Sequence, residues 1–154
     1  DTVRHAYSGR VLVKLSPNAP NIVQVARAVA DAGADGLTAV NTLGPGMLID
    51  VRARWPVLSN LVGGISGAAL HPIAVRCVYE LAAAIDLPII GTGGVSSGED
   101  AMRMLMAGAT AVGVGSALHS RGPNAFRLIL GELEQLMREE GYSRLDEFRG
   151  CAHV

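Results

Sequence analysis

The sequence predicts an α/β fold of the (β/α)8-barrel type, in which these 154 residues supply roughly the last four βα units, a half barrel. Three observations lead to this prediction. Apolar runs of strand length alternate with amphipathic helical patterns, which is typical of parallel strands joined by right-handed crossovers. Polar residues gather where the expected strands end, as they do in the active sites of barrels. Two successive strands then close on glycine turns.

The first half of the chain predicts two strands and two helices. The apolar run 10–16 indicates a strand that ends at Pro17. Residues 22–33 place apolar side chains three and four positions apart and therefore predict a helix. A second strand is expected over 35–41. After a long connection, the apolar stripe of residues 71–85 predicts the second helix.

The second half repeats this order. A strand is expected over 87–92, and Ser97 with two acidic residues behind it predicts the start of a helix that runs to 107. A fourth strand over 111–115 precedes a last helix over 126–141. Four such units fit either an open doubly wound sheet or half of an eight-fold barrel. The short strands favour the half barrel, and no G-x-G-x-x-G fingerprint follows the first strand, which disfavours dinucleotide binding.

Composition and charge exclude several classes of protein. Hydrophobic residues make up 49% of the chain and are mostly small and aliphatic, as in parallel layers covered on both faces. The net charge of −1 shows no excess of the basic residues that are typical of nucleic-acid-binding proteins. No apolar run reaches the length of a membrane span. The first ten residues do not resemble a signal peptide. Because the chain begins with Asp1, we expect it to be a piece of a longer protein.

The chain has two cysteines, Cys77 and Cys151, which stand far apart and in no ligand-type spacing. Cys77 falls within a helical pattern and is expected to be a small core residue. Reduced thiols of this kind are typical of a cytoplasmic protein. The histidines have no carboxylate or second histidine at a metal-like spacing, so no metal site is predicted. His71, at the start of a helix, is expected to cap the helix or to be solvated.

The stretch 42–70 is unusually long for a βα connection, and connections of more than about 12–15 residues are usually functional or disordered. A disordered segment would be more polar, so we expect an ordered loop in which 63–67 closely approaches a ligand. A glycine-rich excursion without a function is the alternative.

Several polar residues at the strand ends are candidates for binding. Lys14 lies within an apolar strand, where an unpaired lysine is costly to bury, so it faces either an anion or solvent on an edge strand. Asn41 and Thr42 close the second strand with an amide and a hydroxyl, which suit a flat polar ligand. An ordinary turn start would also place Asn and Thr there.

Two glycine turns provide the most informative pattern. The apolar runs that end at 91–94 and at 115–116 each precede a helix. Backbone N–H groups at such a turn bind phosphate dianions. Two such turns on consecutive strands match the phosphate-binding site found after strands seven and eight of a barrel. Each turn alone is weak evidence, but the pair predicts a phosphate-anchored ligand.

Six longer motifs resemble the C-terminal half of class 1 dihydroorotate dehydrogenases, and most closely the NAD-linked 1B branch. The resemblance covers the chain from about residue 11 to its end. The motifs are VLVKLSPN (11–18), AGADGLTAVNT (32–42), PVLSNLVGGISG (56–67), HPIAVRCVYEL (71–81), PIIGTGGVSSGEDA (88–101) and MAGATAVGVGSA (106–117).

The resemblance implies an FMN-containing (β/α)8 barrel and gives roles to individual residues. Lys14 would lie beside the pyrimidine edge of the flavin, where a cation stabilises negative charge. Asn41 and Thr42 would bind dihydroorotate or orotate. The remaining FMN contacts implied by the resemblance are Val40, Gly67, Gly93, Gly94, Gly115 and Ser116, the last four of which would hold the phosphate.

One part of the family pattern is missing from the chain. The family uses a cysteine base in an upstream loop, and neither Cys77 nor Cys151 lies in such a loop, so no catalytic residue is assigned. In the complete 1B enzyme, FMN would oxidise (S)-dihydroorotate in pyrimidine biosynthesis. A homodimer and a partner subunit with FAD and a 2Fe–2S cluster are expected. The alternatives are a half barrel that binds FMN or phosphate without activity, and a dihydropyrimidine dehydrogenase-like FMN domain.

Overall fold

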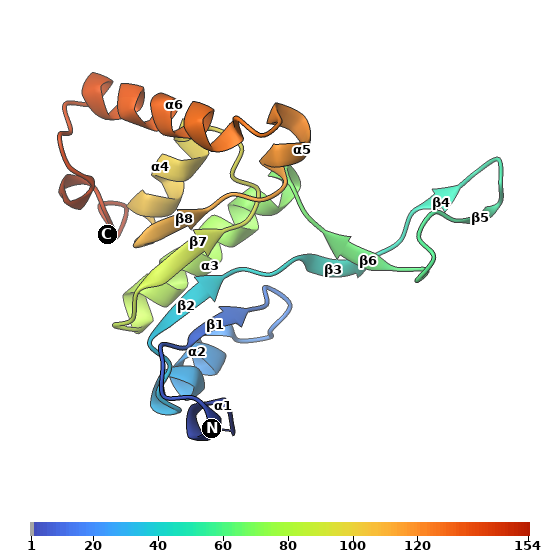
Figure 1. Cartoon of the computed structure of the whole chain (residues 1–154), viewed down its shortest axis with the longest axis horizontal. Helices are drawn as coiled ribbons and strands as arrows, with labels where there is room; N and C mark the ends of the chain where they lie inside the picture. The colour runs from blue at the N-terminus through green and yellow to red at the C-terminus, as the bar shows by residue number, and fades with distance from the viewer. Residues whose placement is uncertain (1) are drawn as a thin grey trace.

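The computed structural model describes residues 2–154 and contains one four-stranded parallel sheet (Figure 1). The strand order is β1-β2-β7-β8, so every strand pairs with the next sheet strand along the chain. The strands are β1 (Leu12–Leu15), β2 (Gly36–Ala39), β7 (Ile89–Thr92) and β8 (Ala111–Gly113). The crossover helices are α2 (Ile22–Asp31), α3 (His71–Ala84) and α4 (Gly98–Met106), and α6 (Ala125–Glu139) follows β8. The predicted α/β order of parallel strands and helices is confirmed, whereas the closure of a barrel stays a prediction.

Local signals in the sequence fix the ends of two helices. The side chain of Asn21 accepts a hydrogen bond from Gln24 N at the start of α2. Ser97 caps α4 in a capping box with Asp100, which satisfies backbone N–H groups of the first turn. α2 and α4 are followed by Gly33 and Gly108, whose φ angles of +85° and +106° suit glycine.

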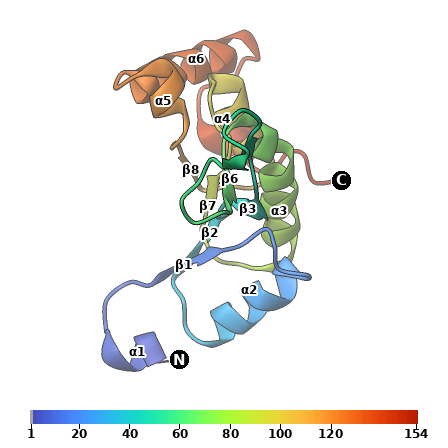
Figure 2. The ribbon, with the colours of Figure 1, turned by 90° about the vertical axis from the view of Figure 1, so that its right-hand side faces the viewer.

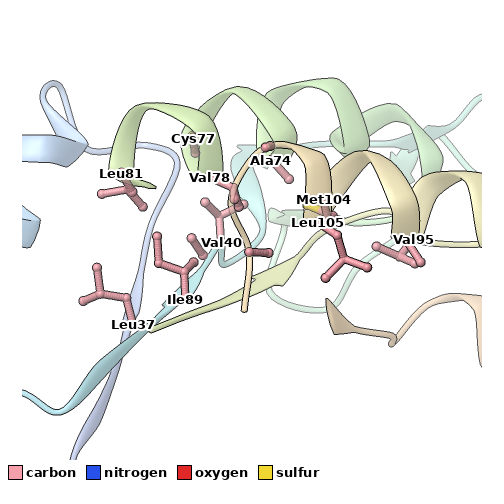
Figure 3. Close-up of a cluster of buried hydrophobic side chains, with 14 of the residues drawn as sticks. Leu37, Val40, Ala74, Cys77, Val78, Leu81, Ile89, Val95, Met104 and Leu105 are labelled. Atoms are coloured by element: carbon pink, nitrogen blue, oxygen red, sulfur yellow. The ribbon is translucent and has the colours of Figure 1, made fainter. Parts of the chain in front are cut away.

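The sheet is covered by helices on one face, which corrects the expectation that both faces are covered. Lys14 pairs in register with Thr38 and Thr38 with Ile90, and all three side chains lie on the more open face. The opposite face holds Leu37 and Ile89, which are buried and point toward α3 (Figure 3). Figures 1 and 2 show α2, α3 and α4 on that side of the sheet.

The core lies between the sheet and α3. Cys77, Val78 and Leu81 of α3 are fully buried there, so the prediction that Cys77 is a core residue is confirmed. Burial raises the pKa of the Cys77 thiol, which keeps it protonated.

Replacing Leu81 by alanine removes a fully buried side chain and is expected to lower the free energy of unfolding by roughly 2–5 kcal/mol. Leu130→Ala on α6, at a position 55% exposed, is the matched control and should change it by no more than about 0.5 kcal/mol. Urea unfolding followed by circular dichroism measures both. Equal losses for the two variants would contradict this description of the core.

The connection 42–70 is ordered, as expected, but it contains short strands that the sequence analysis did not predict. It contains two antiparallel ladders, in which β3 (Leu43–Gly46) pairs with β6 (Gly63–Ile65) and β4 (Ile49–Asp50) with β5 (Trp55–Pro56). Together they form an arm that projects from the sheet (Figure 1). Its outer part exposes large apolar side chains. They are Met47, Leu48, Ile49, Val51, Trp55 and Val57.

Four short helical segments were not predicted. α1 (Thr2–Ala6) lies at the start, and Arg4 of this helix binds Asp35 before β2 at 2.6 Å. The 3-10 turn η1 (Ala68–Leu70) leads directly into α3. α5 (Ala117–Arg121) follows the second glycine turn, and η2 (Leu145–Glu147) follows α6. Each spans five residues or fewer, which is too short for a helical period to be recognised.

Candidate functional site

One pocket at the carboxyl ends of the strands contains all nine predicted binding residues. Its cavity volume is about 120 Å³. The structure therefore brings these residues together, although their roles stay predictions. The nine residues are Lys14, Val40, Asn41, Thr42, Gly67, Gly93, Gly94, Gly115 and Ser116.

Chain topology explains this convergence. Parallel strands end at the same edge of a sheet, so the residues that follow β2, β7 and β8 meet there. Lys14, on β1, reaches the pocket from within its strand. Gly67 arrives from a different direction, because it lies between the arm and η1.

Lys14 is the only lysine in the sequence and lies on the edge strand β1 with its side chain exposed. Within residues 2–154, its ammonium group takes part in no hydrogen bond or ion pair. Both interpretations of its position therefore hold in part: it is an exposed edge residue, and it lines the pocket. A cation without a protein partner is available to a negatively charged group in the pocket.

The two glycine turns present unpaired donors to the pocket. In the described part of the chain, the backbone N–H groups of Gly93, Gly94, Gly115 and Ser116 donate no hydrogen bond. The turn after β7 has φ angles of +139° and +68° at its two glycines. Backbone donors of this kind, at the starts of helices, suit an anion with several acceptor oxygens.

The glycines of the pocket differ in what a side chain would meet. A Cβ atom added at Gly67 or Gly115 would have no atom of another residue within 4 Å, so both positions open onto free space. A Cβ at Gly93 would lie 2.6 Å from Ala74 Cβ, and one at Gly94 would lie 2.5 Å from the carbonyl oxygen of Gly67. Glycine is thus needed at 93 and 94 for packing within the protein itself.

Only the second part of residues 63–67, which were expected to approach a ligand, lines this pocket. Gly63 and Gly64 do not line the pocket. A Cβ at these positions would meet side-chain atoms of Leu58 and Thr42, respectively. These two glycines therefore serve close packing within the arm.

Three further residues line the pocket without having been predicted as binding residues. Thr92, at the end of β7, carries a recognisable signal because it is a polar residue at a strand end. Ser66 directly precedes Gly67 and carries no signal of its own. Leu70 is a buried side chain whose position depends on the 3-10 turn before α3.

His71 neither caps a helix end nor is solvated, in contrast to the expectation. It is buried, with 7% of its surface exposed, and its Nδ1 lies 3.0 Å from the carbonyl oxygen of Gly93. Its Nε2 lies 3.5 Å from Oδ1 of Asp100. His71 therefore contacts the first glycine turn from behind the pocket.

Asp100 stabilises the start of α4. Burial alone would raise the pKa of its carboxyl group, but hydrogen bonds from Ser96 and Ser97 and the nearby His71 outweigh burial and lower the pKa below its usual range. Its carboxylate accepts hydrogen bonds from Ser96 N at 3.0 Å and Ser97 N at 3.1 Å. The ionised form is thus the one that orders the segment after the glycine turn.

Replacing Asp100 by asparagine should lower the stability of the protein in a pH-dependent way. Because the folded-state pKa is depressed, the carboxylate contributes stability above its unfolded pKa of about 3.9, and this contribution is lost as the pH falls below that value. We expect a loss of roughly 1–2 kcal/mol near neutral pH. The difference between wild type and variant should shrink below about pH 4. Urea unfolding at both pH values measures it, and a constant difference would contradict the assignment.

Comparison with known proteins identifies the family of the chain. The family model described as dihydroorotate dehydrogenase matches residues 1–137. The chain belongs to the dihydroorotate dehydrogenase family. It is 47% identical over 151 residues to a protein of Methanothermobacter thermautotrophicus named dihydroorotate dehydrogenase B (NAD(+)), catalytic subunit. Proteins of the same name from Methanocaldococcus jannaschii and Geobacter metallireducens are 45% and 46% identical over 151 and 152 residues.

These alignments cover nearly all of the chain but only part of the related dihydroorotate dehydrogenases. They include 98% of the chain for the two archaeal proteins and 99% for that of Geobacter metallireducens. The same alignments include 50%, 49% and 49% of those proteins, so the chain spans about half the length of the curated relatives it matches.

Residues 2–154 contain neither a helix suited to a membrane nor a cluster of metal-binding side chains. No helix there is long and apolar enough to cross a membrane. No group of three or more His, Cys, Asp or Glu side chains lies close enough to hold a metal ion.

Proposed function

We propose that the chain is the FMN-binding C-terminal half of the catalytic subunit of an NAD-linked dihydroorotate dehydrogenase, a cytoplasmic enzyme. The complete enzyme oxidises (S)-dihydroorotate to orotate in de novo pyrimidine biosynthesis. The observation that carries this proposal is the convergence of the nine predicted residues on one pocket at the strand ends. The names of the relatives support the choice of dihydroorotate over another pyrimidine.

The chemistry of the pocket fits FMN. The phosphate would accept hydrogen bonds from the free N–H groups of Gly93, Gly94, Gly115 and Ser116. Gly67 and Gly115 leave space that a side chain would fill, which suits close contact with a ligand. Lys14 supplies a cation for the isoalloxazine ring, and Val40 contributes backbone contact. FMN, when bound, supplies the two-electron acceptor of the reaction.

The residues after β2 would bind the substrate. Asn41 and Thr42 line the same pocket as Lys14, and the side-chain amide of Asn41 makes no hydrogen bond to other described residues. An amide offers both donors and an acceptor to the carbonyl and N–H groups of a pyrimidine ring. These two residues would orient dihydroorotate against the flavin.

No residue in the chain is assigned as the base that removes a proton from dihydroorotate. Cys77 is buried in the core, and Cys151 is exposed near the C-terminus, and neither lines the pocket. We assign this step to the half of the enzyme that precedes this chain. A half barrel that binds FMN without turnover is therefore the second candidate, and the absence of a cysteine from the pocket favours it for the chain alone.

The size of the pocket and the edges of the sheet support a half barrel. The cavity of about 120 Å³ is smaller than the roughly 300–1,000 Å³ of a typical cofactor pocket. Among the described residues, β1 and β8 each pair with a strand on one side only, so both edges are open to further parallel strands. An upstream half would pair with these edges and complete the walls of the pocket.

The proposal includes protein partners. The exposed apolar residues of the arm, among them Trp55 and Val51, form a surface suited to protein contact. We propose a homodimer and, because the relatives are named catalytic subunits, an electron-transfer subunit with FAD and a 2Fe–2S cluster that passes electrons to NAD+.

Titration of the purified chain with FMN, followed by anaerobic addition of dihydroorotate, tests the proposal. Saturable FMN binding is expected, and bleaching of the flavin should require an added N-terminal half. Bleaching by the chain alone would show that it contains a base and would refute the second candidate. Failure to bind FMN both alone and with the N-terminal half would refute the proposed cofactor site.

A further inference from the structure

The glycine turn after β7 separates two pockets. On one side, Gly94 lines the pocket at the carboxyl ends of the strands described above, which we call the strand-end pocket. On the other side, it lines a second hollow of about 510 Å³ between α3 and the start of α4, which we call the outer pocket. His71 and Asp100 line the outer pocket and do not line the strand-end pocket. Side chains that line the outer pocket can therefore hold the turn while a ligand binds it from the strand-end pocket.

His71 holds the beginning of the turn. A carbonyl oxygen only accepts hydrogen bonds, so the 3.0 Å contact with Gly93 O places a proton on Nδ1, which donates it. His71 is buried, with 9% of its side chain exposed, and its Nε2 makes no hydrogen bond within residues 2–154. A buried ring held by one hydrogen bond to the turn has little freedom to rotate away.

Asp100 holds the end of the turn from the same side. Its Oδ2 accepts hydrogen bonds from Ser96 N and from the Ser96 hydroxyl at 2.9 Å, while Oδ1 accepts one from Arg103 at 3.0 Å. Oδ1 also faces Nε2 of His71 at 3.5 Å. The two side chains thus hold the segment from Gly93 to Ser97 at both ends.

The geometry of the Gly93–Gly94 peptide bond sets the direction in which the Gly94 N–H group points. The peptide bond between Gly93 and Gly94 is trans, so the Gly93 carbonyl and the Gly94 N–H point in opposite directions. The carbonyl points to His71, on the side of the outer pocket. The N–H of Gly94 therefore points away from His71, toward the strand-end pocket, and it donates no hydrogen bond to any described residue.

The backbone of α3 adds a steric limit. A Cβ at Gly94 would lie 2.9 Å from His71 N, so the turn packs directly on the first residue of the helix. Rotation of the Gly93–Gly94 peptide would break the bond to His71 and turn the N–H away from the strand-end pocket.

We propose that His71 is a positioning residue for phosphate binding: its Nδ1–H fixes the Gly93–Gly94 peptide so that the Gly94 N–H faces the phosphate of FMN. This inference rests on the proposed function. It gives His71 a role in recognising the phosphate and none in recognising the flavin ring.

Riboflavin provides the comparison that tests this role, because it has the same ring and ribityl chain as FMN but no phosphate. Wild type should bind FMN more tightly than riboflavin. His71→Leu, which removes the donor, should lower FMN affinity roughly 3- to 10-fold and leave riboflavin affinity unchanged. His71→Asn places an amide N–H near the position of Nδ1 and should restore the ratio, whereas His71→Gln places it near Nε2 and should not.

Cys77→Ala, at another buried position of α3 farther along the helix, is the control for loss of packing and should leave the ratio of the two affinities unchanged. Should His71→Leu fail to fold, the pair His71→Asn and His71→Gln provides the test, because only His71→Asn keeps an N–H near the position of Nδ1. A ratio of FMN affinity to riboflavin affinity that is the same in these two variants would overturn the inference.

The two possible failures are distinct. A wild-type protein that binds FMN and riboflavin equally would refute the proposed phosphate site, and the inference with it. A wild-type preference for FMN that His71→Leu leaves intact, or a parallel loss of both affinities, would refute only the role of His71.

Discussion

Replacing Lys14 by alanine is expected to lower the two-electron reduction potential of bound FMN by roughly 30–60 mV. A hydrogen bond to a charged group contributes about 1.5–3 kcal/mol, and about 1.4 kcal/mol corresponds to 30 mV for a two-electron couple. Lys14 lines the pocket and has no protein partner in the described chain, so its charge is free to stabilise the electrons added to the flavin. In the complete enzyme, the same change should slow flavin reduction by dihydroorotate.

Two variants control for this effect. Lys14→Arg keeps the cation and should restore most of the potential. Arg10→Ala removes the same charge from an exposed residue just before β1 that does not line the pocket, and it should leave the potential unchanged. Equal shifts for Lys14→Ala and Arg10→Ala would mean that Lys14 acts only through the overall charge of the protein.

Replacing Gly115 by alanine is expected to weaken FMN binding roughly 5- to 150-fold. The added methyl group meets no other residue within 4 Å in the free protein, so folding is unaffected, but it projects into space that we assign to the ligand. Overpacking of this kind costs about 1–3 kcal/mol, and about 1.4 kcal/mol is a factor of ten in affinity. Fluorescence titration with FMN measures the change.

Gly131→Ala is the matched control, because a Cβ there also meets nothing within 4 Å. Gly131 lies within α6, so alanine should raise the free energy of unfolding by about 0.5–1 kcal/mol without changing FMN affinity. A third variant, Gly94→Val, should abolish FMN binding. The valine side chain would collide with Gly67 and His71, however, so this variant also disturbs the fold. Unchanged FMN affinity in Gly115→Ala would exclude Gly115 from the site.

The sequence was sufficient to predict the sheet and its helices because their apolar patterns are periodic and local. The four strands and the helices α2, α3, α4 and α6 appear in the predicted order, with strands shorter than expected. Seven of the nine pocket residues could be chosen because the carboxyl ends of parallel strands meet at one edge. The choice of Val40 and Gly67 depended on the family motifs.

Other features depend on contacts that no local pattern encodes. β3 contains glycine and proline, β6 contains two glycines, and the two strands pair across a long insertion, so neither strand shows alternation. The bond between His71 and Gly93 joins residues 22 positions apart, and it exists only because α3 packs behind the turn. Composition also cannot show that helices cover only one face of the sheet, because it counts residue types and does not say on which face of a strand each residue lies.

The most direct test of the proposed cofactor site uses the single lysine of the chain. Reductive methylation with isotope-labelled formaldehyde gives one lysine methyl signal, that of Lys14, in addition to the signal of the N-terminus. We expect this signal to shift during titration with FMN and to saturate at one FMN per chain, because Lys14 lies in the pocket with the two glycine turns. FMN binding that leaves the Lys14 signal unchanged would contradict the proposed site.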